Sequence, residues 1–317
     1  MIYEDSRIPV AAIVGPTASG KTALGVEAAK YFGGEVISAD SMQIYKGMDV
    51  ATAKPTEEEK QGIPHHLMDF LDRECSFSVA DFVELAGMKI REINGRGKLP
   101  IIVGGTGLYI SSLLDNIKFA EIKSDENLRK SLEETARTEG NEKLFKRLEA
   151  VDPETAAELH PNNLVRVIRA IEVYELTGKK LSQYKVESRL IPTPYKSVII
   201  GIGYNDRQKL YDRINKRVDI MAQNGLVEEA KAVYNNSAMK TAANAIGYKE
   251  LIPYFENRAE LAVCIDKIKQ ETRRYAKRQL TWFRKNAEIQ WIIADEFDNT
   301  QEIFAKCKKI IAKELNL

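Results

Sequence analysis

A phosphate-binding loop is the clearest chemical feature of the sequence. Residues 15–22, Gly-Pro-Thr-Ala-Ser-Gly-Lys-Thr, match the spacing G-x-x-x-x-G-K-[ST] at every fixed position. Glycines let backbone N–H groups turn towards phosphate oxygens, Lys21 adds a positive charge, and the hydroxyl of Thr22 is a typical ligand of Mg²⁺. The sequence therefore predicts a site for a polyphosphate and Mg²⁺, but the motif does not identify the group that carries the phosphates.

Two further polar segments follow apolar runs that have the character of buried strands. Asp40 comes directly after the run 35–39, and Thr106 lies in a glycine-rich segment after the run 99–103. In an open parallel sheet the carboxyl ends of the strands meet where ligands bind, so we expect both residues near the phosphate loop. A carboxylate there could bind a metal or take a proton from an attacking nucleophile, although Asp40 could also simply cap the next turn. Gln43 adds an amide, which can bond an adenine edge at two points.

A strongly basic segment lies near the end of the chain. Residues 267–285 contain eight Lys or Arg and one Glu, a charge of +7, whereas the other residues hold 39 positive and 45 negative side chains, a charge of −6. Basic side chains can neutralise RNA phosphates, and the interleaved Tyr275, Trp282 and Phe283 could stack on unpaired bases. The alternative is a helix with its aromatic residues in the core and its cations in water, and Trp282 and Phe283 fit this alternative better.

The elements that must position these residues alternate between short apolar runs and helical stretches. The apolar runs are continuous, which is typical of parallel strands covered on both faces. We expect five strands, at residues 10–14, 35–39, 99–103, 197–202 and 289–293. Helices between them make βαβ units, so the predicted class is α/β, with a P-loop NTPase-like parallel sheet as the core.

The region 122–195 interrupts this order, because it has no strand-like run and is rich in charged helical stretches. We expect three helices in it, at residues 124–139, 141–150 and 163–177. A long basic helix is predicted at about 259–285. The predicted organisation is a P-loop α/β core, residues 1–121 and 196–317, with residues 122–195 as a helical insertion, to which the resemblance described below assigns tRNA binding.

Composition excludes several classes of protein. The 317 residues carry a net charge of +1, with 44% hydrophobic and 29% charged residues, which excludes disordered and collagen-like chains. Three scattered cysteines form neither a disulfide framework nor a metal knuckle, and no ligand spacing surrounds His65 and His66. No apolar run approaches the roughly 18 residues that cross a bilayer. We therefore expect a cytoplasmic protein that acts away from membranes, as a monomer.

Taken together, these segments resemble bacterial tRNA dimethylallyltransferases, the isopentenyl-tRNA transferase family. The resemblance spans nearly the whole chain, and its motifs occur in the order of the family. They are the loop 15–22, Asp-Ser-Met-Gln-Ile-Tyr at 40–45, Ala-Lys-Pro at 53–55, Gly-Ile-Pro-His-His-Leu-Met-Asp at 62–69, Gly-Gly-Thr-Gly-Leu-Tyr at 104–109, the Arg-containing helix 163–173 and the basic segment 270–284.

The resemblance implies the reaction and its participants. The chain would transfer a dimethylallyl group from dimethylallyl diphosphate to the N6 amine of the adenosine at position 37 of tRNA, next to the anticodon, with Mg²⁺ as cofactor. Asp40 would be the general base, with Thr106 and Lys21 as further catalytic residues. The diphosphate would be bound by Gly15, Pro16, Thr17, Ala18, Ser19, Gly20, Lys21, Thr22 and Arg217, with Thr22 as the metal ligand.

The tRNA contacts implied by the resemblance come from three parts of the chain. The anticodon stem-loop, with its adenine turned out into the site, would be contacted by Asp40, Ser41, Met42, Gln43, Thr106, Arg129, Val165, Arg166, Val167, Ile168, Arg169 and Arg278. Arg166 and Arg169 could instead form ion pairs with Glu172 and Glu175 on the surface of their own helix.

Two other functions are compatible with the phosphate loop. A kinase could bind ATP there and use Asp40 as its base, although a small acceptor needs neither the helical insertion nor the basic segment. A non-catalytic RNA-binding protein could use the loop as a nucleotide switch. Three polar segments that converge on one edge with a candidate base disfavour this non-catalytic role.

Overall fold

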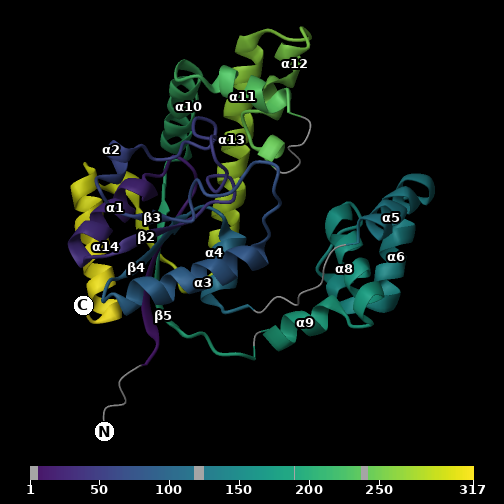
Figure 1. Cartoon of the computed structure of the whole chain (residues 1–317), viewed down its shortest axis with the longest axis horizontal. Coiled ribbons are helices and arrows are strands. Elements are labelled where there is room, and N and C mark those ends of the chain that lie inside the picture. The colour runs from purple at the N-terminus through teal and green to yellow at the C-terminus, as the bar shows by residue number, and fades with distance from the viewer. Residues whose placement is uncertain (1–5, 118–124, 189, 237–241) are drawn as a thin grey trace. The chain divides into compact units, whose positions relative to one another are not determined.

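A six-stranded sheet with all strands parallel forms the centre of the larger part of the chain (Figure 1). The computed structural model describes residues 6–117, 125–188, 190–236 and 242–317. The strand order is β3-β2-β4-β1-β5-β6, and the strands are β1 (Ile8–Val14), β2 (Glu35–Ala39), β3 (His65–His66), β4 (Pro100–Gly104), β5 (Tyr195–Gly203) and β6 (Gln290–Ile293). All five predicted strands are present with ends within two residues of those expected, whereas β3 is too short to form an apolar run. The predicted α/β class is confirmed.

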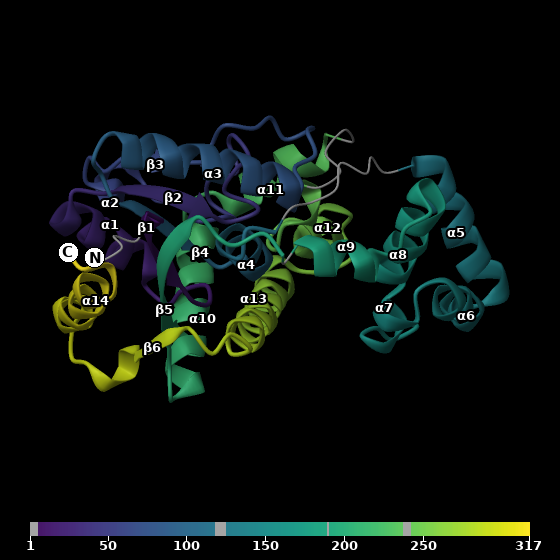
Figure 2. The same cartoon turned by 90° about the horizontal axis from the view of Figure 1, so that it is seen from below.

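Helices cover both faces of this sheet (Figure 2). The helices α1 (Lys21–Phe32) and α14 (Thr300–Leu315) pack on one face, and α3 (Val79–Gly95) and α4 (Gly107–Leu114) pack on the other. Alternate residues of β1 contribute to the two layers, and every residue of β2 is buried. This two-sided burial is the reason that the strands are continuous apolar runs in the sequence.

A further group of helices follows β5. It comprises α10 (Arg207–Gln223), α11 (Leu226–Tyr234), α12 (Ile252–Phe255) and α13 (Leu261–Phe283), and the short α2 (Glu57–Lys60) lies earlier in the chain. α13 is the predicted basic helix, two residues shorter at each end. It packs against α10, and apolar side chains of α11 and α13 enclose Ile44, Tyr45 and Met48. Within the described ranges no helix is both long and apolar enough to span a bilayer.

The chain divides into two compact units, residues 1–114 with 193–317, and residues 115–192. The second unit is helical, with α5 (Glu126–Glu139), α6 (Asn141–Val151), α7 (Pro153–Ala157), α8 (Leu164–Thr177) and α9 (Leu181–Ser188). The three predicted helices correspond to α5, α6 and α8, and α7 and α9 were not predicted. The predicted boundary at residues 121 and 122, and the start of the first predicted helix at 124, lie outside the described residues.

A cluster of charges surrounds the start of β2. The carboxylate of Glu35, 3% exposed, accepts hydrogen bonds from Arg96 and Lys98 at 2.7 and 2.8 Å, and it lies 2.7 Å from Nε2 of His66. Burial opposes the ionisation of Glu35, but the bonds from Lys98, His66 and Arg96 outweigh it and lower its pKa to about 2. His66 therefore has a structural role, consistent with the absence of a metal-ligand spacing around it.

Candidate active site

The phosphate loop connects β1 to α1 in the predicted strand–loop–helix arrangement. Ala18 and Gly20 have positive φ angles of 63° and 91°, which give the loop its tight turn. Two basic side chains brace its backbone: Lys21 donates to the carbonyl of Pro16 at 3.2 Å, and Nε of Arg213 donates to the carbonyl of Ala18 at 2.9 Å. The loop is therefore preorganised at the amino end of α1, where the helix dipole favours an anion.

A cavity of about 290 Å³ opens beside this loop. It is lined by residues of the phosphate loop, of the segment after β2, of α10 and of α13. Among the predicted site residues it brings together Thr17, Lys21, Thr22, Asp40, Ser41, Met42, Gln43, Arg217 and Arg278. Gly15, Pro16, Ala18, Ser19 and Gly20 do not line it, and the buried Ser19 hydroxyl has no hydrogen-bond partner among the described residues.

The electrostatics of the cavity favour an anionic ligand. Burial, together with the nearby charge of Arg217, lowers the pKa of Lys21 to about 8, while Asp40 acts in the opposite direction. Burial also lowers the pKa of Arg217, again opposed by Asp40. Two cations are thus held in a desolvated position with one carboxylate, an arrangement that a polyanion would relieve.

Asp40 caps the turn that follows β2, and its role as a general base stays a prediction. Its Oδ1 atom accepts hydrogen bonds from the backbone N–H groups of Met42 at 2.9 Å and Gln43 at 3.3 Å, which caps the turn after β2. Its Oδ2 atom makes no hydrogen bond with any described residue, so it can accept a proton from a ligand in the cavity. The turn therefore fixes the carboxylate without using its second oxygen.

Thr106 is near these residues but does not line the cavity. Its hydroxyl accepts a hydrogen bond from the N–H group of Ser41 at 3.1 Å, so it ties the loop after β4 to the turn that carries Asp40. Gln43 is also bonded within the protein: Nε2 donates to the carbonyls of Thr52 at 3.1 Å and Ala53 at 3.3 Å. A contact of Gln43 with adenine at two points would require it to give up these bonds, and the tRNA contact of this residue stays a prediction.

Gln279 on α13 is a site residue to which the sequence reasoning gave no role. Gln279 is 5% exposed. Its Oε1 atom accepts a hydrogen bond from the N–H group of Thr17 at 2.9 Å, and its Nε2 atom donates one to the carbonyl of Gly105 at 3.0 Å. One amide thus joins the phosphate loop to the loop after β4. The signal in the sequence is a polar residue at helical spacing from Ile268 and Ala276 on the apolar face of α13.

Tyr275, one of the aromatic residues predicted to stack on unpaired bases, also lies on α13. It lines the cavity, and burial together with the charge of Asp40 raises its pKa to about 12, while hydrogen bonds with Thr106 and Gln279 act in the opposite direction. Arg278 lies over the Tyr275 ring, 5.6 Å from its centroid. The core alternative is confirmed for Phe283, which is 2% exposed, whereas Trp282 is 37% exposed.

In the helical unit, the three arginines predicted to contact tRNA, Arg129 on α5 and Arg166 and Arg169 on α8, have different environments. The carboxylate of Glu172, fully buried, pairs with Arg129 at 2.9 Å and with Arg169 at 2.6 Å. Burial opposes this ionisation, but the two arginines lower the pKa of Glu172. Arg166 is exposed, so of these three arginines it alone has no partner among the described residues. Ion pairing therefore competes with phosphate contact at Arg129 and Arg169.

The apolar residues predicted to touch tRNA also differ in exposure. Val165 is 83% exposed, whereas Val167 and Ile168 are 0% and 5% exposed and belong to the core of the helical unit. Only Val165 offers its side chain to a ligand. The contacts of Val167 and Ile168 with tRNA stay predictions, and their side chains stabilise the helix that carries them.

No group of three or more His, Cys, Asp or Glu side chains that could hold a metal occurs in the described part of the chain. Mg²⁺ does not require such a group, because it commonly binds through one or two protein oxygens, water and substrate phosphates. Thr22 lines the cavity beside Lys21, so its hydroxyl fits this mode of binding.

Several known proteins are similar to this chain in sequence and fold. The family model described as IPP transferase matches residues 43–286. The tRNA dimethylallyltransferase of Thermoanaerobacter sp. (strain X514) is 49% identical, covering 98% of this chain and 99% of that protein, and that of Bacillus subtilis (strain 168) is 48% identical, covering 96% and 95%. The crystal structure of a tRNA isopentenylpyrophosphate transferase from Bacillus halodurans aligns with a TM-score of 0.73 and 44% identity, covering 98% and 97%. A eukaryotic dimethylallyltransferase acting on tRNA aligns with a TM-score of 0.80 and 30% identity, covering 96% and 80%.

Proposed function

Because this chain belongs to the IPP transferase family, we propose that it transfers a dimethylallyl group from dimethylallyl diphosphate to the N6 amine of the adenosine at position 37 of tRNA, releasing diphosphate. The observation that supports this chemistry is the cavity beside the phosphate loop. It combines two partly buried cations, Lys21 and Arg217, with a carboxylate, Asp40, that has one oxygen free of hydrogen bonds to the described residues. A diphosphate leaving group and a proton from an amine need these two kinds of residue.

In the proposed reaction, Thr17, Lys21, Thr22 and Arg217 bind the diphosphate. Mg²⁺, held by the Thr22 hydroxyl and by phosphate oxygens, would neutralise part of the charge on the leaving group. The amine nitrogen forms a bond to the allylic carbon as the bond between that carbon and the diphosphate oxygen breaks. Oδ2 of Asp40 takes the proton that the nitrogen loses. Positioning and charge stabilisation carry this displacement, so no protein nucleophile is needed.

Gln279 and Thr106 hold the segments that carry the phosphate-binding residues and Asp40. The Gln279 amide holds the phosphate loop, and the Thr106 hydroxyl holds the turn that carries Asp40. The base and the leaving-group site are therefore fixed relative to each other by two partly buried polar contacts. We propose that Thr106 acts through this contact with the Asp40 turn. We also propose that the protein works as a monomer, and light scattering would test this oligomeric state.

The function is tested by incubating the protein with isotopically labelled dimethylallyl diphosphate, Mg²⁺ and unmodified tRNA, followed by mass analysis of the nucleosides. Asp40→Asn should lower turnover by about 10²- to 10⁴-fold while tRNA affinity is kept, because only proton acceptance is lost. Asp298→Asn, the same change at an exposed residue, is the control and should have no effect. Phosphoryl transfer from ATP without prenyl transfer would contradict the proposal, and wild-type turnover by Asp40→Asn would contradict the assignment of the base.

A further inference from the structure

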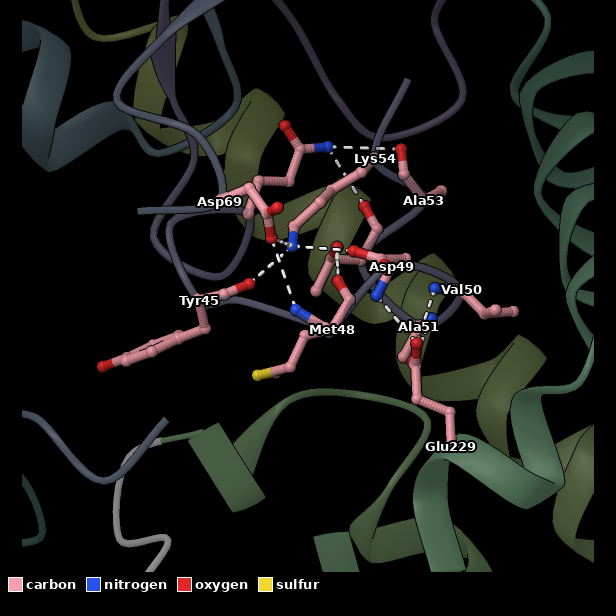
Figure 3. Close-up of polar contacts among 12 residues, drawn as sticks. Tyr45, Met48, Asp49, Val50, Ala51, Ala53, Lys54, Asp69 and Glu229 are labelled. Carbon is pink, nitrogen blue, oxygen red and sulfur yellow. Dashed lines mark hydrogen bonds and ion pairs between the residues drawn. The ribbon is translucent and has the colours of Figure 1, made fainter. Parts of the chain in front are cut away.

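The loop of residues 47–54, which follows the Asp40 turn, is held by a carboxylate from a distant helix (Figure 3). Oε2 of Glu229, on α11, accepts hydrogen bonds from the backbone N–H groups of Asp49 at 2.7 Å and Val50 at 2.9 Å. Its Oε1 atom accepts a hydrogen bond from the N–H group of Ala51 at 2.9 Å. The hydroxyl of Tyr248 donates to the same Oε1 atom at 2.8 Å. Four donors thus converge on one carboxylate, which fixes the path of the loop backbone.

The same loop is held at its other end by Lys54, whose side chain is 6% exposed. Its ammonium group donates to the carbonyl of Tyr45 at 2.5 Å and to Oδ1 of Asp49 at 2.8 Å, and it pairs with Asp69. Asp69 also accepts the N–H group of Gly47 at 3.3 Å. The buried ammonium has an acceptor for each of its three hydrogens, and these contacts hold this end of the loop to Tyr45 and Asp69.

The backbone conformation of this loop determines the orientation of the Gln43 amide. The loop carbonyls of Thr52 and Ala53 accept hydrogen bonds from its Nε2 atom at 3.1 and 3.3 Å, which uses both hydrogens of that group. The Oε1 atom accepts one bond, from the Ser38 hydroxyl at 3.3 Å, and an amide oxygen has two acceptor positions. Gln43 therefore brings to the cavity a hydrogen-bond acceptor and no free donor.

We propose that Glu229 and Lys54 are positioning residues, which hold the 47–54 loop so that the Gln43 side chain presents its oxygen as an acceptor for the amino group of the target base. This inference rests on the proposed function, because it takes an adenine as the ligand of the cavity. Adenine carries an amino group at C6, whereas hypoxanthine and guanine carry a carbonyl oxygen there. An acceptor oxygen favours the amino group and leaves the carbonyl without a donor, which disfavours those bases. With Asp40, the site then has an acceptor for each hydrogen of the amine.

The test measures equilibrium binding of two anticodon stem-loop RNAs that differ only at the target position, one with adenosine and one with inosine. Dimethylallyl diphosphate is left out, so the measurement does not depend on turnover. The wild-type protein should bind the adenosine RNA at least about fivefold more tightly, the effect of one hydrogen bond of typical net strength. In Glu229→Gln an NH₂ group faces backbone N–H donors and the loop loses its anchor, so the ratio should fall about fivefold, to the discrimination that Asp40 alone provides.

Glu228→Gln is the matched control, because it makes the same change at an exposed residue of the same helix and should keep the wild-type ratio. Gln43→Leu should lower the ratio by the same factor, and adding Glu229→Gln to it should change the ratio no further, since Glu229 acts through Gln43. If Glu229→Gln does not fold, Tyr248→Phe takes its place, because it removes a single donor from Glu229 and should lower the ratio at least twofold.

Three results would overturn the inference: equal binding of the two RNAs by the wild-type protein, a wild-type ratio in folded Glu229→Gln, or an unchanged ratio in Tyr248→Phe. A wild-type protein that discriminates between the RNAs but transfers no dimethylallyl group would instead contradict the proposed function. The affinity for dimethylallyl diphosphate, measured separately, should stay within about twofold in the Glu229 variant, because the phosphate loop is held by Gln279 and Arg213.

Discussion

Lys21 should make the binding of diphosphate depend on pH. Its pKa in the free protein is about 8, because burial and the neighbouring Arg217 disfavour the charged form. A bound diphosphate favours the charged form and raises this pKa, so binding is strong below pH 8 and weakens as the pH rises through that value. The charged fraction of Lys21 is about 90% at pH 7 and about 10% at pH 9, so the Kd for dimethylallyl diphosphate should rise about ninefold across this interval.

Calorimetric titration of the protein with dimethylallyl diphosphate between pH 6.5 and 9.5 measures this dependence, and a phosphate pKa of about 6 keeps the ligand's own charge nearly constant. The control is Lys21→Arg, whose guanidinium stays charged throughout, so its Kd should be flat across the range whatever its absolute value. A wild-type Kd that does not change between pH 7 and 9 would refute the reasoning. A slope that persists in Lys21→Arg would assign the titration to another group.

Three further predictions concern polar contacts within one or the other of the two units. Gln279→Leu removes both bonds that link the phosphate loop to Gly105, so the free energy of unfolding in urea should fall by about 2 kcal/mol. Glu172→Gln breaks a buried charge-assisted pair with the half-exposed Arg129 and should cost the helical unit about 2 kcal/mol by the same measurement, whereas Glu175→Gln should cost less. Glu35 has a pKa of about 2 in the folded protein, below its usual value of 4.5. The stability that its ionised form contributes above pH 4.5 should therefore be lost as the pH falls from 4.5 to 2. In Glu35→Gln, the free energy of unfolding should depend less on pH over this interval.

Much of the site was predictable because its chemistry depends on short segments. The phosphate loop places Lys21 and Thr22 at the start of a helix whatever the rest of the chain does, and the run 35–39 places Asp40 at the carboxyl end of a buried strand. The five strand predictions succeeded for a related reason: a strand covered on both faces must be apolar along its length. The segment 65–66 has no such signature, since only two residues pair with β2 and both are histidines.

The contacts that complete the site join residues far apart in the chain. Gln279 bonds Thr17 across 262 positions, and Glu229 bonds Asp49 across 180. In the sequence, Gln279 is one polar residue within a basic helix and Glu229 is one of two adjacent acidic residues on α11, with nothing local to show which is buried. Arg169 poses a related difficulty, because its helical spacing of three from Glu172 allows both a phosphate contact and an ion pair. Arg129 pairs with the same carboxylate from another helix, 43 positions away.

The sequence by itself determined the strand–loop–helix unit, the position of the candidate base, the α/β class and the resemblance to a family, because each depends on residue types at fixed local spacing. Only the tertiary structure decided which carboxylates and amides are buried against which backbone groups, and therefore which predicted side chains have a free hydrogen-bonding position. The physical reason is that a buried polar group must find its partner wherever packing places one, and packing brings together residues that the sequence keeps apart.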